Sequence, residues 1–278
     1  MQHSTSDQIR ALVSGLHAPD RVRYPELAEY TRDELYTDFF GGGGLYLATH
    51  MTRTLRLKPG DIVLDLGCGK GPASIFLAKH FDVKIVAVDL WTSATFLNDR
   101  FTARGYRDRI VPLNLDVTQK LPFAEDYFDA IFCLNSFNFY GGSVEFVQRL
   151  LTHLKPGGQL CLGSEVLSDE FTAEQLQHPP HVYAFQLPPP NEQVNVFEDD
   201  FKKQHTPAWW RSLFEQAGLD VEHCAEPDDA GVIYEELVRY EYEHDLDPFD
   251  VDMCLQQIEW SRTHRPRKTL FVLTASKR

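Results

Sequence analysis

A glycine-rich turn between an apolar run and a helix-forming segment constrains the fold of this chain more than any other feature. The apolar run 61–66 (DIVLDL) leads into Gly67, Gly69 and Gly71, in the spacing G-x-G-x-G. Glycine adopts backbone angles that other residues avoid, and it lets a ligand approach the main chain closely. A helix that begins after such a turn offers free N–H groups to an anionic group. The pattern predicts a strand, a ligand-binding turn and a helix in succession.

Apolar runs and helical segments alternate through most of the chain. Nearly continuous apolar runs are typical of strands buried on both faces, and their alternation with helices predicts a doubly wound, parallel α/β sheet. Strands are expected at 61–66, 83–89, 110–115, 127–135, 159–163, 220–224 and 269–275, and helices at 7–17, 30–40, 45–57, 73–81, 92–104, 144–154 and 209–217.

Two regions are expected along the chain. Residues 1–60 are predicted to form a helical N-terminal cap or lid, and residues 61–278 the ligand-binding domain, with insertions at 165–206 and 228–262. The first insertion follows the carboxyl end of a strand, where it is well placed to cover a site as an inserted cap; an ordinary surface excursion is the alternative. The second is expected to form one or two acidic helices whose charge is solvated.

Composition excludes several classes of protein. The net charge of −14 disfavours a nucleic-acid partner, because an acidic surface repels phosphate backbones. No apolar run approaches the ~20 residues that span a bilayer, so no membrane association is expected. The five cysteines lack close pairing, and we expect reduced core residues in a cytoplasmic protein with no secretion signal. We expect no metal site, because no cluster of ligands has the required spacing.

Three acidic residues occupy positions that suit a nucleoside ligand. Asp65 lies just before the glycine turn, where it can pair with an ammonium group. Asp89 ends the second expected strand, where a carboxylate can accept hydrogen bonds from both ribose hydroxyls. Asp116 follows the third expected strand, placed to accept from an exocyclic amine. Plain helix-cap and turn roles remain alternatives for Asp89 and Asp116.

These motifs resemble those of the class I S-adenosylmethionine-dependent methyltransferases. The matching stretches are VLDLGCGKG (63–71), VDLW (88–91), LDVTQKLPFAEDYFDAIFCLNSF (115–137) and LKPGG (154–158). The resemblance implies a seven-stranded Rossmann-like sheet with its last strand antiparallel. It also implies S-adenosyl-L-methionine as cofactor and S-adenosyl-L-homocysteine as product. The cofactor-binding residues expected on this basis are Asp65, Gly67, Cys68, Gly69, Gly71, Asp89, Leu90, Asp116, Val117 and Asn135.

The stretches DFFGGGGLYLA (38–48) and LPF (121–123) resemble the small-molecule branch of that family, which includes ubiquinone-type and sarcosine-type methyltransferases. The chain is therefore expected to methylate a small molecule on nitrogen, oxygen, carbon or sulfur. The acidic first insertion and Glu165 slightly favour an amine. Two alternatives stay open: aminopropyl-type transfer on the same fold, and a non-catalytic cofactor-binding or scaffold protein. The sequence does not indicate an oligomeric state.

The acceptor site is expected above the carboxyl ends of the first and fourth strands. Positioning of the acceptor against the methyl group is the main task there, and a base is needed only for a protonated acceptor. The candidate catalytic residues are Asn138, Tyr140 and His205, and the candidate substrate-binding residues are Tyr36, Phe40, Tyr46, Phe137, Glu165 and Tyr183. A structural role is the alternative for each of them.

Overall fold

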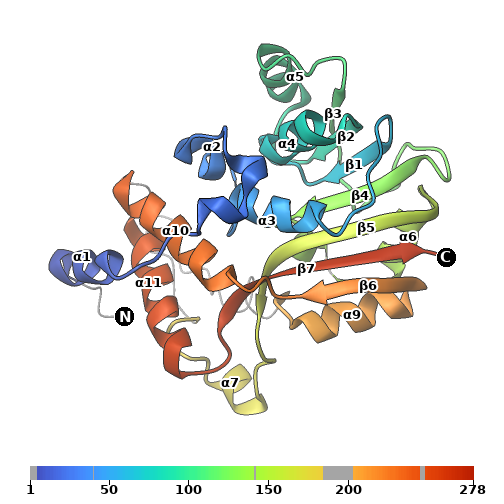
Figure 1. Ribbon diagram of the computed structural model, residues 1–278. Helices are drawn as coiled ribbons and strands as arrows, with labels where there is room; N and C mark the ends of the chain where they lie inside the picture. The colour runs from blue at the N-terminus through green and yellow to red at the C-terminus, as the bar shows by residue number, and fades with distance from the viewer. Residues whose placement is uncertain (1–4, 40, 141, 184–202, 245–247) are drawn as a thin grey trace.

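A single mixed sheet forms the centre of the computed structural model, which describes residues 5–39, 41–140, 142–183, 203–244 and 248–278 (Figure 1). The strand order is β3-β2-β1-β4-β5-β7-β6. Strand β7 runs antiparallel to β5 and β6, and the other neighbours are parallel, so the predicted seven-stranded Rossmann-like sheet is confirmed. The strands are β1 (Ile62–Leu66), β2 (Lys84–Asp89), β3 (Ile110–Asn114), β4 (Phe128–Leu134), β5 (Leu154–Leu167), β6 (Leu219–Ala225) and β7 (Lys268–Lys277).

The carboxyl ends of the parallel strands meet at one edge of the sheet. The register places Leu66 beside Val88, and Asp89 beside Asn114. Strand β1 lies between β2 and β4, so the strand order reverses there. The loops that follow β1 and β4 diverge at such a reversal and leave a crevice, which is where ligands bind in open α/β sheets.

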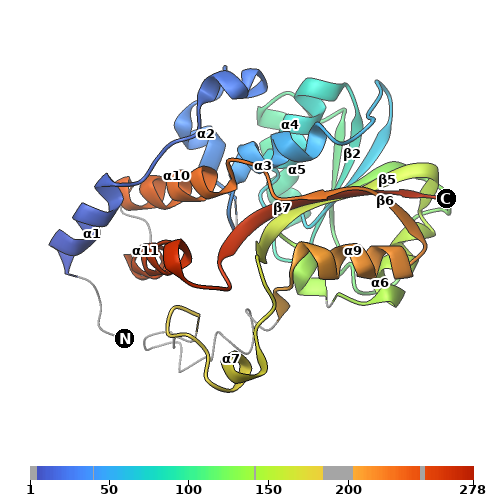
Figure 2. The ribbon, with the colours of Figure 1, turned by 60° about the horizontal axis from the view of Figure 1, so that its bottom comes forward.

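Helices cover both faces of the sheet (Figure 2). On one face lie α3 (Gly44–Thr52), α4 (Pro72–Phe81) and α5 (Ala94–Ala103), and on the other lie α6 (Val144–Leu151) and α9 (Pro207–Gln216). Each helix buries an apolar stripe against the strands. In α6 that stripe consists of Phe146, Val147, Leu150 and Leu151. Shorter elements connect the rest: η1 (Arg21–Arg23), η2 (Pro25–Leu27), η3 (Phe137–Tyr140) and α7 (Ala173–Gln177).

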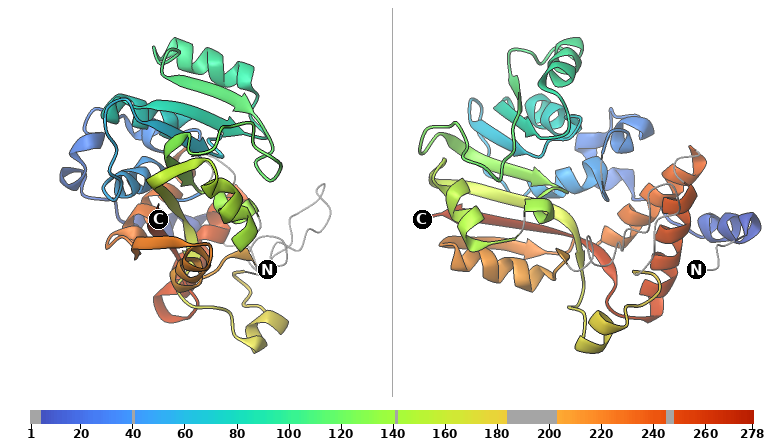
Figure 3. Two further views of the ribbon diagram at one scale, coloured as in Figure 1. Left: turned by 90° about the vertical axis from the view of Figure 1, so that its right-hand side faces the viewer. Right: turned by 180° about the vertical axis from the view of Figure 1, so that it is seen from behind.

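A group of helices from both ends of the chain gathers at one end of the sheet (Figure 1). These are α1 (Ser6–Ser14), α2 (Arg32–Tyr36), α10 (Ala230–Glu243) and α11 (Pro248–Thr263). Figure 3 shows α1 beyond α11, at the opposite end of the molecule from the end of β7. We call residues 5–39 together with α10 and α11 the cap. Its helices share an apolar cluster of Val13, Leu16, Tyr234, Val238, Val251, Leu255 and Ile258.

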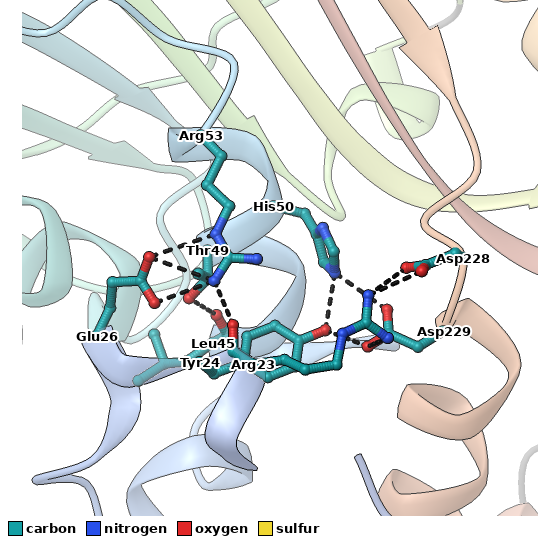
Figure 4. A network of polar contacts seen from close by, with 9 residues as sticks. All are labelled: Arg23, Tyr24, Glu26, Leu45, Thr49, His50, Arg53, Asp228 and Asp229. Carbon is teal, nitrogen blue, oxygen red and sulfur yellow. Dashed lines mark hydrogen bonds and ion pairs between the residues drawn. The ribbon is translucent and has the colours of Figure 1, made fainter. Parts of the chain in front are cut away.

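A buried polar network joins the N-terminal part of the cap to the start of α10 (Figure 4). The Tyr24 hydroxyl donates to Asp229 Oδ2 at 2.5 Å and lies 2.8 Å from His50 Nε2. His50 Nε2 is 3.1 Å from Asp229 Oδ1, and Arg23 forms ion pairs with Asp228 and Asp229. Burial lowers the pKa of His50, although Asp229 opposes that effect. The network fixes α3 and α10 relative to each other.

The expectation that the charge of residues 228–262 is simply solvated is therefore wrong in part. Asp229 and Glu236 are buried. Glu236 pairs with Arg32 at 2.7 Å and also with Arg239. A buried carboxylate needs such partners because its desolvation is costly.

The two largest differences between predicted and observed boundaries concern one helix and one strand. The helix expected at 30–40 is confined to Arg32–Tyr36, because Asp38 has a φ of 73° and leaves the helical region. The strand expected at 159–163 extends over all of Leu154–Leu167, because it pairs with β4 from its start and with β7 to its end. No helix in the described part of the chain is long and apolar enough to cross a membrane.

Candidate functional site

A cavity of about 510 Å³ lies at the carboxyl ends of β1, β2 and β4, in the crevice that the topology predicts. Asp65, the glycine turn, Asp89 and Asn135 all contribute to its walls. A smaller cavity of about 140 Å³ adjoins it and contains Asp116. The residues common to both cavities are Gly67, Asp89, Trp91, Ser136 and Phe139. The two cavities form one candidate site on either side of the glycine turn.

The glycine turn fits its surroundings too closely for any side chain. Gly67 has a φ of 73°, and a Cβ added there would lie 2.3 Å from both Ser136 Oγ and the Tyr140 hydroxyl. Gly71 has a φ of 84° and is the residue before α4; a Cβ there would lie 2.6 Å from the Phe101 ring. Backbone conformation and space together require glycine at both positions.

Asp89 connects the glycine turn to the loop after β2. Its Oδ2 accepts a hydrogen bond from Gly69 N at 2.9 Å. Its Oδ1 accepts from Trp91 N at 2.8 Å and Thr92 N at 2.7 Å. A carboxylate has about four acceptor positions, so Oδ2 retains capacity for a further donor. The carboxylate is thereby fixed in position at the boundary of the two cavities.

Asp65 is a buried carboxyl group in the wall of the larger cavity. Its side chain accepts one hydrogen bond, from Ser74 Oγ at 2.5 Å. Burial raises the pKa of Asp65 to about 7; Ser74 opposes this shift and the nearby Asp89 adds to it. A cation placed beside Asp65 would favour the charged form again. The site therefore suits a ligand with a positively charged group at this point.

Asn135 presents an acceptor atom that the described residues leave unused. The residue has a φ of 56°, and its Nδ2 donates to the Gly42 carbonyl at 2.8 Å. Its Oδ1 is buried, and no donor in the described part of the chain reaches it. Because Asn135 lines the larger cavity, a bound ligand can supply the missing donor.

The smaller cavity combines one acid with apolar side chains. Asp116 Oδ1 accepts from Thr118 N at 2.9 Å and from Thr118 Oγ1 at 2.6 Å, which keeps the pKa of Asp116 below its ordinary value. Leu90 and Val117 line the same cavity. The arrangement suits a flat ring with an exocyclic donor group.

Aromatic residues surround the mouth of both cavities. Trp91 is 78% exposed and Phe139 is 57% exposed, and their ring centroids lie 6.0 Å apart. Phe96 lines the larger cavity beside them. Trp91 and Phe96 are absent from the residues predicted from sequence. Trp91 belongs to the VDLW motif two residues after Asp89, and this closeness was the available signal; Phe96 has no comparable signal.

A segment of the N-terminal region closes one side of the larger cavity. We call residues 38–39 and 41–44 the strap. Asp38 and Phe39 line the cavity. Asp38 forms ion pairs with Lys70 at 3.1 Å and Arg100 at 2.7 Å. Although burial opposes them, these cations hold the pKa of Asp38 below its ordinary value.

Several residues predicted to bind the acceptor lie in the core instead. Tyr36 and Tyr46 are buried and contact each other, with centroids 6.1 Å apart. Phe137 is buried against aromatic neighbours from α6 and α9. Tyr183 is buried, and its hydroxyl donates to the Pro266 carbonyl at 3.0 Å. None of these four lines either cavity in the described part of the structure, because their large rings pack against other core residues. Phe40 lies outside the described residues.

The polar candidates are also distributed differently from the prediction. Tyr140 lines the smaller cavity, whereas Asn138 lines neither cavity. His205 stacks on Trp209 with centroids 3.9 Å apart and lies away from both cavities. Glu165 is paired with Lys268 at 2.5 Å, so its charge is already neutralised by the chain itself. The reason for favouring an amine acceptor at Glu165 is thereby removed.

Known proteins resemble this chain over the region that builds the cavities. Residues 63–158, about a third of the chain, match the family model described as methyltransferase domain. The chain is 28% identical over 145 residues to phosphoethanolamine N-methyltransferase 3 of Arabidopsis thaliana, which covers 51% of this chain and 29% of that protein. It is 30% identical over 122 residues to 27-O-demethylrifamycin SV methyltransferase of Amycolatopsis mediterranei, which covers 44% of each. The aligned region spans less than half of each relative.

The structural comparison extends over more of the chain. Phosphoethanolamine N-methyltransferase 2 of Haemonchus contortus, solved in complex with S-adenosyl-L-methionine, matches with a TM-score of 0.66 and 15% identity. The match covers 93% of this chain and 58% of that one. This likeness shows the fold. Residues 63–158 are therefore similar to a methyltransferase domain, and they lie within a Rossmann-like sheet.

Proposed function

We propose that this chain is an enzyme that transfers a methyl group from S-adenosyl-L-methionine to a small molecule. The observation that carries the proposal is the convergence of Asp65, Gly67, Asp89 and Asn135 on one cavity at the strand ends. All four lie within the stretch that matches the methyltransferase domain. A pocket of this size is typical of small-molecule and cofactor sites.

The residues present fit S-adenosyl-L-methionine at five points. The buried Asp65 would pair with the ammonium group, and Asn135 Oδ1 would accept a hydrogen bond from the cofactor. Asp89 would hold the ribose, and the glycine turn with Cys68 would lie along the methionine part. Bound there, S-adenosyl-L-methionine supplies an electrophilic methyl group on a sulfonium and leaves S-adenosyl-L-homocysteine as product. The adenine would fill the smaller cavity, beside Leu90, Asp116 and Val117.

The chain's own contribution is to bind, align and exclude water. Holding acceptor and methyl in line can lower the barrier by about 7–11 kcal/mol. Cys68 is no nucleophile, because burial raises the pKa of its thiol well above the ordinary value. Among the described residues, neither cavity is lined by histidine. We infer that the acceptor reacts as bound, without a histidine base, and that Phe139, which lines both cavities, orients it.

The acceptor atom remains open between nitrogen, oxygen, carbon and sulfur. One relative is named for methylation of nitrogen and the other for a demethylated 27-O position. The ion pair of Glu165 gives no support to an amine. Nothing at the site favours aminopropyl transfer.

The organisation of the chain fits the proposed reaction. We propose that residues 1–60 cover the methyltransferase domain of residues 61–278, and that α10 and α11, which form part of an insertion in that domain, pack with them. The net charge of −14 supports a small molecule rather than a nucleic acid as partner, and the cysteines support a cytoplasmic location.

Product analysis with labelled cofactor tests the proposal. The purified protein is incubated with S-adenosyl-L-methionine labelled in the methyl group, or with its decarboxylated form labelled in the aminopropyl carbons, together with a panel of small amines, alcohols and thiols. We expect methyl label in one acceptor and an equal amount of S-adenosyl-L-homocysteine. Transfer of the aminopropyl label would support the alternative reaction, and cofactor binding without turnover across a broad panel would support a scaffold protein.

A further inference from the structure

The strap is held by the ends of two neighbouring strands through a single residue. Gly42 N donates to Glu165 Oε1 at 2.6 Å, and the Gly42 carbonyl accepts from Asn135 Nδ2 at 2.8 Å. Glu165 lies near the end of β5, and Asn135 directly follows β4. Gly42 therefore links a residue outside the cavity to one that lines it.

A buried ion pair fixes the outer end of this link. Glu165 Oε2 lies 2.5 Å from Lys268 Nζ, and the two side chains are only 14% and 10% exposed. Although burial opposes it, Glu165 holds the pKa of Lys268 above its ordinary value, so the ammonium form is favoured. Lys268 Nζ also lies 5.4 Å from the centroid of the Tyr234 ring. With its Oε2 held by Lys268, Glu165 directs Oε1 at the strap.

The strap is packed tightly at this point. A Cβ added to Gly42 would lie 2.6 Å from Glu165 Oε1, 3.1 Å from Leu270 and 3.2 Å from Tyr234. Neither Glu165 nor Lys268 lines the described cavities. Two hydrogen bonds, from Gly42 N to Glu165 and from Asn135 to the Gly42 carbonyl, connect the ion pair to the larger cavity.

We propose that Glu165 and Lys268 are positioning residues for the cofactor site. The ion pair orients Glu165, Glu165 seats Gly42, and the Gly42 carbonyl holds the Asn135 amide so that its Oδ1 remains available to the ligand. This inference rests on the proposed function, because it assigns Asn135 to the cofactor. It also gives Glu165 a role other than the binding of a cationic acceptor.

Two single variants and their combination test whether the ion pair affects cofactor binding. Glu165→Gln keeps an acceptor for Gly42 N but leaves Lys268 without its carboxylate, and Lys268→Met leaves Glu165 as a buried, unpaired charge. We expect either variant to weaken S-adenosyl-L-homocysteine binding about tenfold, a change of about 1.4 kcal/mol. The double variant E165Q/K268M should recover most of the affinity, because no unpaired charge remains and the introduced side-chain amide still accepts from Gly42 N.

A second ion pair on the same sheet supplies the control. Lys155 Nζ lies 2.7 Å from Asp129 Oδ1, at the other end of β4 and β5. Lys155→Met and Asp129→Asn should lower the midpoint of urea unfolding without changing cofactor affinity. If they weaken binding as much as the Glu165 variant at equal loss of stability, the pair at Glu165 is merely structural and the proposal fails.

Further outcomes separate this inference from the proposed function. Gly42→Ala places a Cβ against Glu165 Oε1 but keeps both charges of the ion pair, so it should weaken binding even if the charge variants fold poorly. Each variant should raise the KM for the cofactor more than it lowers kcat. Wild type that binds no cofactor would overturn the proposed function itself. Wild type that binds, with all three single variants binding equally well, would overturn only the positioning role.

Discussion

The glycine turn and the cap reach their structures in opposite ways. At the turn, backbone angles define the conformation: Gly67 and Gly71 have φ angles of 73° and 84°, and Gly69 N donates to Asp89 at the end of the next strand. In the cap, Tyr24 meets Asp229 across 205 positions of sequence, and His50 meets Asp229 across 179. Local backbone geometry dominates in the first region, and long-range side-chain contacts dominate in the second.

The difference indicates that substitutions in the turn should affect function most, and that substitutions in the cap should affect stability most. A turn shaped by its backbone has no substitute for glycine, so damage there should remove binding. A cap held by several hydrogen bonds and ion pairs should lose stability gradually while the cavity persists. The predictions below separate these two behaviours, beginning with the largest effect.

Replacement of Gly67 by alanine should have the largest effect. The added Cβ would clash with Ser136 and Tyr140 at 2.3 Å, and the φ of 73° disfavours any side chain. We expect S-adenosyl-L-homocysteine affinity to fall by about a hundredfold or more, and unfolding free energy to fall by about 3 kcal/mol. Calorimetric titration and urea unfolding measure the two effects.

Gly105 provides the matched control. It has a φ of 78°, and a Cβ added there would meet nothing within 4 Å. Gly105→Ala should therefore cost only the backbone penalty of about 1–2 kcal/mol and leave affinity unchanged. If the two variants behaved alike, the close fit at Gly67 would have no functional meaning.

Asp65 should give cofactor binding a distinct pH dependence. Its pKa is about 7 in the free protein. An ammonium group favours the ionised carboxylate, so affinity should fall as the pH falls below about 7, by up to about tenfold per pH unit. Titrations with S-adenosyl-L-homocysteine between pH 8 and pH 6 measure the slope. Asp65→Asn should bind more weakly with a flatter profile, and an unchanged slope would exclude Asp65 as its source.

The same group affects the stability of the free protein with the opposite sign. The folded-state pKa lies above the ordinary value near 4, so between about pH 4 and 7 the folded protein retains a proton that the unfolded chain releases. The contribution of Asp65 to unfolding free energy therefore falls as pH rises through this window and is constant above it. Asp65→Asn should remove that decline in urea unfolding.

Replacement of Tyr24 by phenylalanine should affect the cap alone. The change removes the hydroxyl that donates to Asp229 and contacts His50, whereas the direct contact between His50 and Asp229 and the ion pair of Arg23 with Asp229 remain. We expect unfolding free energy to fall by about 1–3 kcal/mol. Cofactor affinity, measured by calorimetry, should change by less than about threefold. A loss of affinity comparable to that of Gly67→Ala would show that cap and turn are energetically one unit.

Replacement of Tyr36 by phenylalanine should have the smallest effect. The Tyr36 hydroxyl is buried, and no hydrogen-bond partner lies among the described residues. Its removal should be neutral, or should raise unfolding free energy by up to about 1 kcal/mol. Thermal unfolding of this variant and of Tyr24→Phe compares the loss of a hydroxyl without a hydrogen bond with the loss of a hydrogen-bonded one. If Tyr36→Phe lowered unfolding free energy more than Tyr24→Phe, the Tyr36 hydroxyl could not be the one without a hydrogen bond.

The contrast also explains which parts were predictable from the sequence. The strands and the glycine turn follow from local apolar runs and from motifs of adjacent residues, and the antiparallel last strand was expected from the resemblance to the methyltransferase family. Asp65, Asp89 and Asn135 were predicted as cofactor residues, and the structure brings them to one cavity.

The cap and the acceptor side were not predictable in this way. Phe137 and Tyr183 carry no sign in the sequence that neighbours from distant segments bury them. The carboxylate of Glu165 gave no sign that Lys268, more than a hundred positions later, neutralises it. Such contacts arise from tertiary packing, which single-residue patterns do not encode.

The most direct test of the central claim is calorimetric titration with S-adenosyl-L-methionine and S-adenosyl-L-homocysteine. The proteins are wild type, Asp89→Ala and, as a control, Asp220→Ala. Asp220 lies on β6 and is paired with Arg278. We predict binding at about micromolar concentrations by wild type and the control, and its loss in Asp89→Ala. Well-folded wild type that binds neither compound would contradict the account.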